Sequence, residues 1–166
     1  LYEILKQYNG TPVETFTGDE CLSGVSPIQG TELCSIVELM YSYELLYAYT
    51  GDKKWVERLE ILAFNALPAA ISDDMWTHQY DQMSNQIACQ RFPVPGKPIF
   101  RTNNEEAHLF GLEPHFGCCT ANFGQGFPKL ALSAFMRAEN EIICAVPIPS
   151  ELKTEDVNIV LETQYP

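Results

Sequence analysis

Two cysteine-bearing motifs constrain this chain more than any other feature. Glu32-Leu33-Cys34 lies in the first quarter of the sequence, and the adjacent pair Cys118-Cys119 lies far beyond it. Three sulfurs and one carboxylate make a complete tetrahedral shell for Zn²⁺. To share one ion, these side chains have to be brought together by the fold from two distant segments. The sequence therefore predicts a zinc site formed by Glu32, Cys34, Cys118 and Cys119.

Glu32 and Cys34 can face one point only where the backbone is not yet helical, because residues two apart on a regular helix point to different sides. Gly30 and Thr31 precede the motif, and threonine is a good N-cap, so we expect the motif at a helix N-terminus with Thr31 as its cap. The alternative is that Cys34 packs in a helix core and the pair is incidental, since free cysteine is often a small buried hydrophobe.

The six cysteines do not require a disulfide framework. A chain of 166 residues with 46% hydrophobic residues has enough apolar material for a core of its own. A disulfide between the neighbours Cys118 and Cys119 would also demand a strained ring. Metal binding or a reduced state is the better interpretation.

Composition limits the partners. Ten basic and 22 acidic residues give a formal charge of −12, which argues against nucleic acid and anionic membrane surfaces. No apolar run approaches 18 residues, so no transmembrane helix is predicted. We expect a soluble protein whose compartment stays open, secretion and the periplasm included. The chain begins at Leu1 and ends within an expected strand region, so we expect it to be a fragment of a longer protein.

Hydrophobic periodicity predicts helices followed by strands. The helices are expected at 1–8, 32–49, 52–68 and about 124–137, and the strands at 141–146 and 157–163. The second and third helices flank Thr50-Gly51-Asp52 and should form a helical hairpin. The cysteine pair is expected on a Gly-flanked loop. The change of period predicts one domain over 1–138 and the start of another over 139–166.

Three further groups are candidates for chemistry. Asp19-Glu20 lies in a loop before the predicted metal helix, where a buried carboxyl could act as a general acid, although neighbouring carboxylates are usually just solvated. His115 could bind a sugar hydroxyl or sit beside the thiolate; the alternative is a structural hydrogen-bonding histidine. The stretch containing His78, Gln79 and Tyr80 combines aromatic rings with amides, as carbohydrate sites do; the alternative is an amide-rich connecting segment.

The motifs Gly18-Asp19-Glu20, Gln29 to Cys34, His78 to Gln86 and Pro114 to Asn122 resemble glycoside hydrolase family 127, the β-L-arabinofuranosidases and their relatives. The resemblance runs from about Gly18 to the C-terminus. It implies a mainly α fold, part of an (α/α)₆ barrel followed by the first strands of a β-sandwich. Thr120-Ala121 replaces a pair of prolines that some members have after the cysteines.

The resemblance also implies roles. Zn²⁺ would be held by Glu32, Cys34, Cys118 and Cys119, with Cys118 as the nucleophile in a retaining mechanism. Glu20 would be the acid/base, with Asp19 as a competitor for that role. The carbohydrate substrate would be a β-L-arabinofuranoside or a related plant-derived sugar, contacted by His115, His78, Gln79 and Tyr80. The alternatives are a glycosidase of the same architecture that acts on an acidic sugar, and a non-catalytic carbohydrate-binding or structural zinc protein.

Overall fold

A computed structural model describes residues 1–18, 20–84, 86, 89, 105–111 and 117–166. Helices dominate these residues, and the strands occur only as antiparallel pairs. The elements in chain order are α1 (Tyr2–Asn9), β1 (Thr31–Glu32), α2 (Leu33–Thr50), α3 (Lys54–Ile61), the π-helical turn η1 (Leu62–Ala66), α4 (Leu67–Ala69), β2 (Asp81–Gln82), the 3₁₀ turn η2 (Glu105–His108), α5 (Gly117–Leu132), β3 (Phe135–Ala138), β4 (Glu141–Cys144), β5 (Ser150–Lys153) and β6 (Asn158–Leu161).

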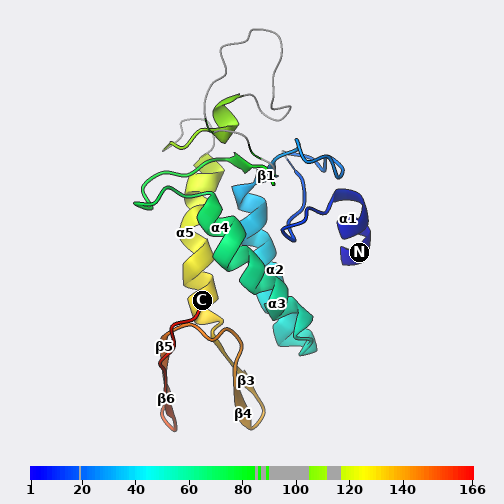
Figure 1. Ribbon diagram of the computed structural model, residues 1–166. Coiled ribbons are helices and arrows are strands. Elements are labelled where there is room, and N and C mark those ends of the chain that lie inside the picture. Colours follow the sequence, from blue (N-terminus) through cyan, green and yellow to red (C-terminus); the bar gives the residue numbers. More distant parts are fainter. Residues whose placement is uncertain (19, 85, 87–88, 90–104, 112–116) are drawn as a thin grey trace.

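Three helical segments pack side by side to form the body of the molecule (Figure 1). α2 runs away from β1, the α3–α4 segment returns antiparallel to it, and α5 then runs in the same direction as α2. The N-terminal ends of α2 and α5 therefore lie at one end of the molecule, and the two β-hairpins lie at the other.

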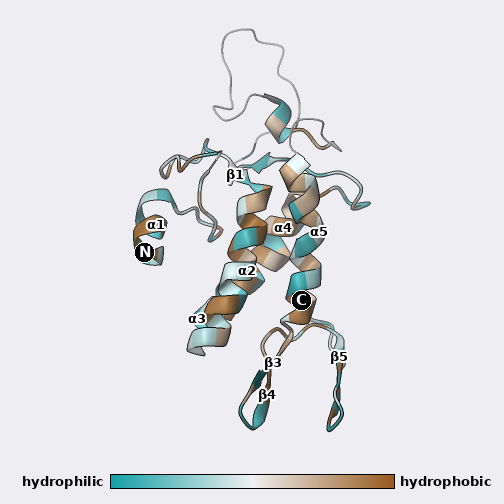
Figure 2. Cartoon of the chain, turned by 180° about the vertical axis from the view of Figure 1, so that it is seen from behind, coloured by the Kyte–Doolittle hydropathy of each residue, from teal (hydrophilic) through white to brown (hydrophobic). Residues whose placement is uncertain are grey.

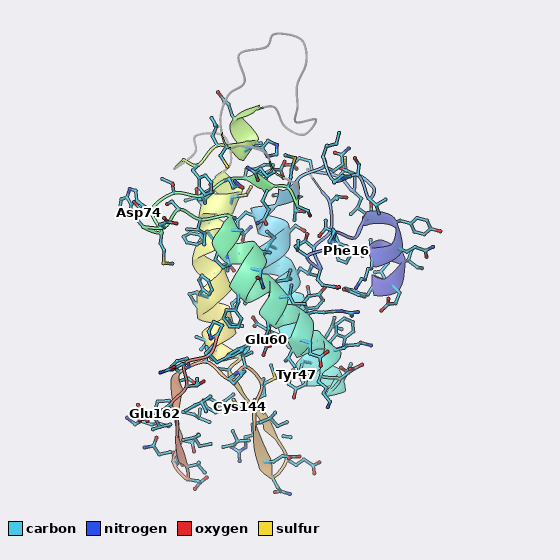
Figure 3. The ribbon with its side chains drawn as sticks, viewed as in Figure 1. Phe16, Tyr47, Glu60, Asp74, Cys144 and Glu162 are labelled. Carbon is cyan, nitrogen blue, oxygen red and sulfur yellow. The ribbon has the colours of Figure 1, made fainter. Side chains whose placement is uncertain are left out.

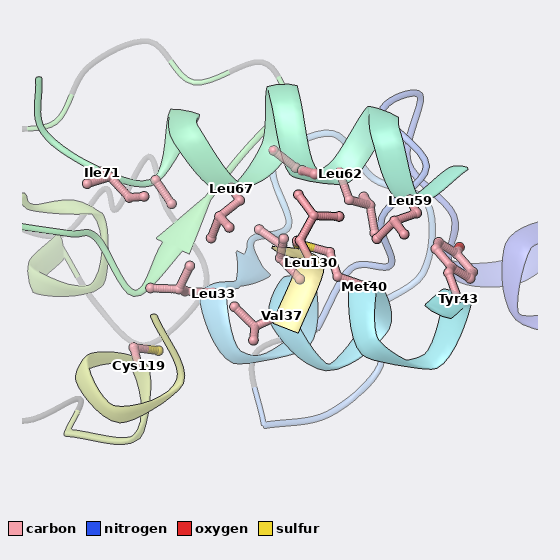
Figure 4. Close-up of a cluster of buried hydrophobic side chains, with 14 of the residues drawn as sticks. Leu33, Val37, Met40, Tyr43, Leu59, Leu62, Leu67, Ile71, Cys119 and Leu130 are labelled. Carbon is pink, nitrogen blue, oxygen red and sulfur yellow. The ribbon is translucent and has the colours of Figure 1, made fainter. Parts of the chain in front are cut away.

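The core forms along one face of α2. Leu33, Ile36, Val37, Met40 and Tyr43 are buried at spacings of three and four residues, as the sequence pattern predicts. Figure 2 shows hydrophobic residues along these helices and hydrophilic ones toward the tip of the β3–β4 hairpin. Figure 4 shows how side chains of α2, α3, α4 and α5 meet in one cluster. This cluster fixes the relative position of the helices whose first turns carry the cysteines.

The expected helical hairpin is confirmed, with a local change before Pro68. α2 ends at Thr50, and Gly51 adopts the left-handed conformation (φ 65°) that closes many helices. The returning helix widens into η1, where the N–H of Leu67 donates to the carbonyl oxygen of Leu62. A proline cannot donate to the helical ladder, and a π turn directly before it accommodates that gap.

α5 begins and ends earlier than the sequence predicts. It spans Gly117–Leu132 instead of 124–137, so the cysteine pair lies in its first turn and not on a loop. Three glycines lower the helix propensity of this segment, but packing against α2 and η1 stabilises the helix. Gly126 is needed there, because a β-carbon at this position would come within 2.7 Å of Leu67.

The end of the predicted helix is a strand. Phe135–Ala138 pairs with Glu141–Cys144, since Glu139-Asn140 allows a tight reversal. The strands predicted at 141–146 and 157–163 are confirmed as β4 and β6, and β5 pairs with β6. The described residues are thus mainly α with small strand pairs. The (α/α)₆ barrel, the β-sandwich and the division at 138 remain predictions. Among the described helices, none is both long and apolar enough to cross a bilayer.

One acidic side chain, Glu44, is buried inside this core. Its exposure is only 3%, and the Ser133 hydroxyl donates to its Oε2 at 2.6 Å. Burial raises the pKa of Glu44 above the ordinary value of 4.5. Because the folded state favours the protonated carboxyl, the free energy of unfolding should fall as the pH rises above the pKa of Glu44 in the unfolded chain. It should level off above the higher pKa that Glu44 has in the folded chain.

We therefore expect Glu44→Gln to melt at a higher temperature than wild type at neutral pH, with the difference shrinking toward pH 4. Thermal unfolding across pH 4 to 8 measures this. Glu38→Gln, at an exposed position of the same helix, serves as the control and should leave the pH dependence unchanged. A constant difference between Glu44→Gln and wild type at every pH would contradict the ionisation argument.

Candidate metal centre and catalytic site

Glu32 and Cys34 reach the same point because the backbone changes conformation between them. Glu32 is extended (φ −67°, ψ 137°) and immediately precedes the first residue of α2, whereas Cys34 is already helical. The expected helix N-terminus is confirmed. The expected cap at Thr31 is wrong, since Thr31 belongs to β1 and Glu32 occupies the capping position. Pairing with β2 holds Thr31 extended, and its hydroxyl lies 3.3 Å from that of Thr15.

Cys118 and Cys119 approach from the first turn of α5. The ligand atoms of Glu32, Cys34, Cys118 and Cys119 all lie within 4.8 Å of one another. Cys34 Sγ is 3.4 Å from Cys119 Sγ, and Cys118 Sγ is 3.9 Å from Glu32 Oε1. The fold therefore brings the four predicted ligands together, and the group could hold a metal ion.

The donor set and its spacing fit zinc. Zinc–sulfur bonds of about 2.3 Å in a tetrahedral shell place neighbouring sulfurs about 3.8 Å apart. The Cys34–Cys119 separation of 3.4 Å is within a few tenths of an ångström of that value. Thiolates select soft or borderline ions, and one carboxylate beside them is compatible with Zn²⁺.

The contacts among the three thiols shift their pKa values in opposite directions. Hydrogen bonds from Cys119 first, and from Asn122 among others, lower the pKa of Cys34 to about 5. The same contact, in which the Cys119 thiol donates to Cys34, raises the pKa of Cys119. Burial and the neighbouring Cys34 raise the pKa of Cys118. Ionisation is therefore favoured at Cys34, and a metal ion would have to displace protons from thiols whose pKa is raised, Cys118 and Cys119.

Solvent access distinguishes the three sulfurs. Cys119 is fully buried against the core (Figure 4), and Cys34 is partly buried. Cys118 is exposed. Since a nucleophile has to reach a substrate, Cys118 is the cysteine of this cluster best placed to react.

Tyr80 connects Glu20 to the start of α2, because the N–H of Leu33 donates to the Tyr80 carbonyl oxygen. The buried Tyr80 side chain donates its phenolic proton to Glu20 Oε1 at 2.9 Å. Burial, the carboxylate of Glu20 and the charge of Glu32 together raise the pKa of Tyr80, so the phenol stays protonated as the donor. Glu20 itself is exposed, with a positive φ of 66°. This hydrogen bond holds the Glu20 carboxylate in place while it stays exposed to solvent.

Backbone bonds hold the Glu20 loop in place. The N–H of Gly18 donates to the carbonyl oxygen of Gly30 at 2.9 Å, and the N–H of Glu32 donates to that of Gly18 at 3.2 Å. The N–H of Leu33 donates to the Tyr80 carbonyl at 2.8 Å. Gly30 packs so closely on the Asp81 carboxylate that a β-carbon there would lie 2.5 Å from it. The segments carrying Glu20, Glu32 and Tyr80 therefore form one unit.

The remaining predicted residues are either buried or outside the described residues. His78 is buried, with its Nε2 2.9 Å from the Thr120 hydroxyl, one residue after the cysteine pair. Gln79 is buried, and its amide lies 3.6 Å from Cys89 Sγ. Their contact with a substrate, like that of Tyr80, remains a prediction. His115 and Asp19 lie outside the described residues.

Sequence reasoning missed several supporting residues. Asn122, which stabilises the Cys34 thiolate, follows the cysteine pair at helical spacing, so a correct helix start would have placed it on the same face. Asp81 is fully buried opposite Glu32 in the β1–β2 pair. His108 is fully buried with its Nδ1 3.0 Å from the Asp81 carbonyl oxygen, and burial lowers its pKa to about 4. No local pattern marks these last two.

No protein-family model, curated protein or solved structure matches this chain.

Proposed function

We propose that this chain is part of a zinc-dependent retaining glycoside hydrolase, with Cys118 as nucleophile and Glu20 as acid/base. The observation that carries this proposal is the placement of Tyr80, whose phenol donates to Glu20 and lies in the field of Glu32. Tyr80 thus contacts the exposed carboxylate of Glu20, while the exposed sulfur of Cys118 lies 3.9 Å from Glu32 Oε1. Retaining glycosidases need one acid/base and one nucleophile near the scissile bond.

The residues divide the reaction into two displacements. In the first, the Cys118 thiolate attacks the anomeric carbon and forms a thioglycosyl bond, while the bond from that carbon to the leaving oxygen breaks and protonated Glu20 gives this oxygen its proton. In the second, Glu20 takes a proton from water, the water oxygen attacks the same carbon, and the Cys118 thiolate leaves. Two inversions give net retention. Bound to Glu32, Cys34, Cys118 and Cys119, Zn²⁺ would supply stabilisation of the thiolate form.

The proposed substrate is a β-L-arabinofuranoside or a related plant-derived sugar. This assignment rests on the resemblance of the motifs around Glu20, Glu32 and Cys118 to glycoside hydrolase family 127. Hydrolysis of 4-nitrophenyl β-L-arabinofuranoside tests it, with the α-anomer and a β-D-glucuronide as the comparison substrates. We expect the β-L-arabinofuranoside to be hydrolysed and its product to appear first as the β-anomer in NMR spectra. Preference for the glucuronide would favour the acidic-sugar alternative.

Glu20→Gln should lower turnover of an alkyl arabinofuranoside by about 10²- to 10⁴-fold, the usual contribution of general acid catalysis. The first step with a dinitrophenyl arabinofuranoside should slow much less, because that leaving group needs no proton. Comparing the pre-steady-state release of the two leaving groups measures the difference. Glu38→Gln is the matched control. If Glu20→Gln hydrolyses the alkyl substrate normally, the acid role belongs to Asp19 or to another residue.

A further inference from the structure

A short segment, residues 78–80, crosses the end of the molecule where α2 and α5 begin. Figure 3 labels Asp74 in the turn before this segment, and in Figure 1 the segment continues in green past the first turn of α5 to β2. The carbonyl oxygen of Tyr80 accepts the N–H of Leu33 at 2.8 Å, directly between the two predicted ligands on the α2 side. His78 contacts the α5 side. The segment therefore touches both helix starts that carry predicted ligands.

Backbone hydrogen bonds fix this segment without help from α5. The N–H of His78 donates to the carbonyl oxygen of Gly111 at 3.2 Å, and the N–H of Gly111 donates to that of His78 at 3.0 Å. The N–H of Gln79 donates at 3.0 Å to the carbonyl oxygen of Ala70, which caps α4. The His78 side chain is thus attached to a backbone whose position is set by other parts of the fold.

The imidazole of His78 is 5% exposed and lies against one face of α5. Its Nε2 is 2.9 Å from the hydroxyl oxygen of Thr120, and its ring centroid is 6.3 Å from that of Phe123, three residues further along the same helix face. Its Nδ1 is buried and has no hydrogen-bond partner among the described residues. A neutral imidazole carries one N–H, and only on Nε2 does that proton have an acceptor within this part of the chain, the Thr120 hydroxyl.

The contact with Thr120 constrains the cysteine pair. Thr120 directly follows Cys119, and both lie in the first turn of α5, where the helical backbone ties their positions together. The Cys119 sulfur is 3.4 Å from the Cys34 sulfur on α2, so a shift of this turn changes that separation directly. The turn begins at Gly117, a poor helix former, and therefore gains from a contact outside the helix.

We propose that His78 is a positioning residue of the metal centre. Through Thr120 it holds the first turn of α5, and with it Cys118 and Cys119, at the separation from α2 that the zinc shell needs. His78 and Thr120 are not ligands in this scheme, and the buried imidazole acts from behind the site without touching a substrate. The inference rests on the zinc site of the proposed function and is independent of sugar hydrolysis.

The test is a double-mutant cycle on the zinc dissociation constant of the full chain, measured by competition with a chromophoric chelator. Thr120→Val removes the hydroxyl and keeps the branched shape, and His78→Phe keeps a ring and removes its nitrogens. Each change should weaken zinc binding by about tenfold, as the loss of a supporting contact does at other metal sites. Because both changes remove the same contact, the double variant should also lose about tenfold and not about a hundredfold.

Spectra of the Co²⁺-loaded protein distinguish positioning from a general loss of stability. Charge-transfer and d–d absorption reports the arrangement of the sulfurs around the ion, so Thr120→Val and His78→Phe should both change it. Thr120→Ser keeps the hydroxyl and should retain the wild-type spectrum and zinc affinity. Thr50→Val, at the exposed opposite end of α2, is the matched control and should change neither.

Three results would overturn the proposal: wild-type zinc affinity in Thr120→Val, additive losses in the double variant, or the same altered spectrum in Thr120→Ser and Thr120→Val. A wild-type chain that binds no zinc would overturn both this proposal and the zinc-dependent function. The predicted cycle without any glycoside hydrolysis would support the role of His78 and contradict the proposed function. If His78→Phe does not fold, the comparison of Thr120→Val with Thr120→Ser decides the question by itself.

Discussion

Cys118→Ser should lose glycoside hydrolysis by about 10³-fold or more, because a serine hydroxyl is neither ionised nor comparably nucleophilic at neutral pH. Cys118 is the exposed sulfur of the cluster and the one open to a substrate. The measurement is kcat and KM on 4-nitrophenyl β-L-arabinofuranoside in excess zinc, so that a weakened metal site is still filled. Cys144→Ser, at an exposed cysteine on β4, is the matched control and should keep wild-type turnover.

The comparison with Cys119→Ser separates the nucleophile from the metal ligands. Cys119 is a predicted zinc ligand, so its replacement should lower zinc affinity. Because Cys119 is fully buried, its replacement should not remove the attacking group. In saturating zinc, Cys119→Ser should recover part of its turnover, whereas Cys118→Ser should recover none. Zinc-saturated Cys118→Ser that hydrolyses the substrate at the wild-type rate would exclude Cys118 as nucleophile.

Removing the metal should produce the largest change in stability. The cluster links the first turns of α2 and α5, which otherwise depend on hydrophobic packing to stay together. A ligand that binds only the folded state at a thousandfold excess over its Kd adds about 4 kcal/mol. For a chain of this size, that corresponds to a shift on the order of 10 °C in Tm.

Calorimetry with and without a chelator measures this shift, and added Zn²⁺ but not Mg²⁺ should restore the original Tm, since Mg²⁺ prefers oxygen ligands. Cys144→Ser should respond as wild type does. An unchanged Tm after complete zinc removal would mean that the four residues do not form a metal site. A large shift accompanied by full activity of Cys118→Ser and Glu20→Gln would favour the structural-zinc alternative.

The sequence predicts which four residues come together because the chemistry of a metal shell restricts the residue types strictly. The residue types in Glu32-Leu33-Cys34 and Cys118-Cys119 match one coordination shell, and one bend of the backbone explains how Glu32 and Cys34 converge. The α2 helix could be predicted equally well, since its buried residues recur at helical spacing. In these cases, the side-chain pattern and the local backbone favour the same structure.

The rest depends on contacts between distant segments. Gly117 and Phe135 mislead a pattern-based prediction of α5, because tertiary packing begins the helix early and strand pairing ends it early. Nothing near Tyr80 in sequence indicates that its hydroxyl contacts Glu20. His108 and Asp81 are likewise joined only by the fold. A carboxylate and its supporting tyrosine are individually ordinary residues, and their pairing becomes visible only in three dimensions.

The most direct test of the central claim is to trap the sugar on the enzyme. Glu20→Gln is incubated with dinitrophenyl β-L-arabinofuranoside, quenched in acid, digested and analysed by mass spectrometry. The activated leaving group allows the first displacement, while loss of the base slows the second, so the intermediate accumulates. We predict one anhydropentose on the peptide containing Cys118, and none when Cys118→Ser is added. Hydrolysis without an adduct, or an adduct on a carboxylate instead, would contradict the proposed thiolate mechanism.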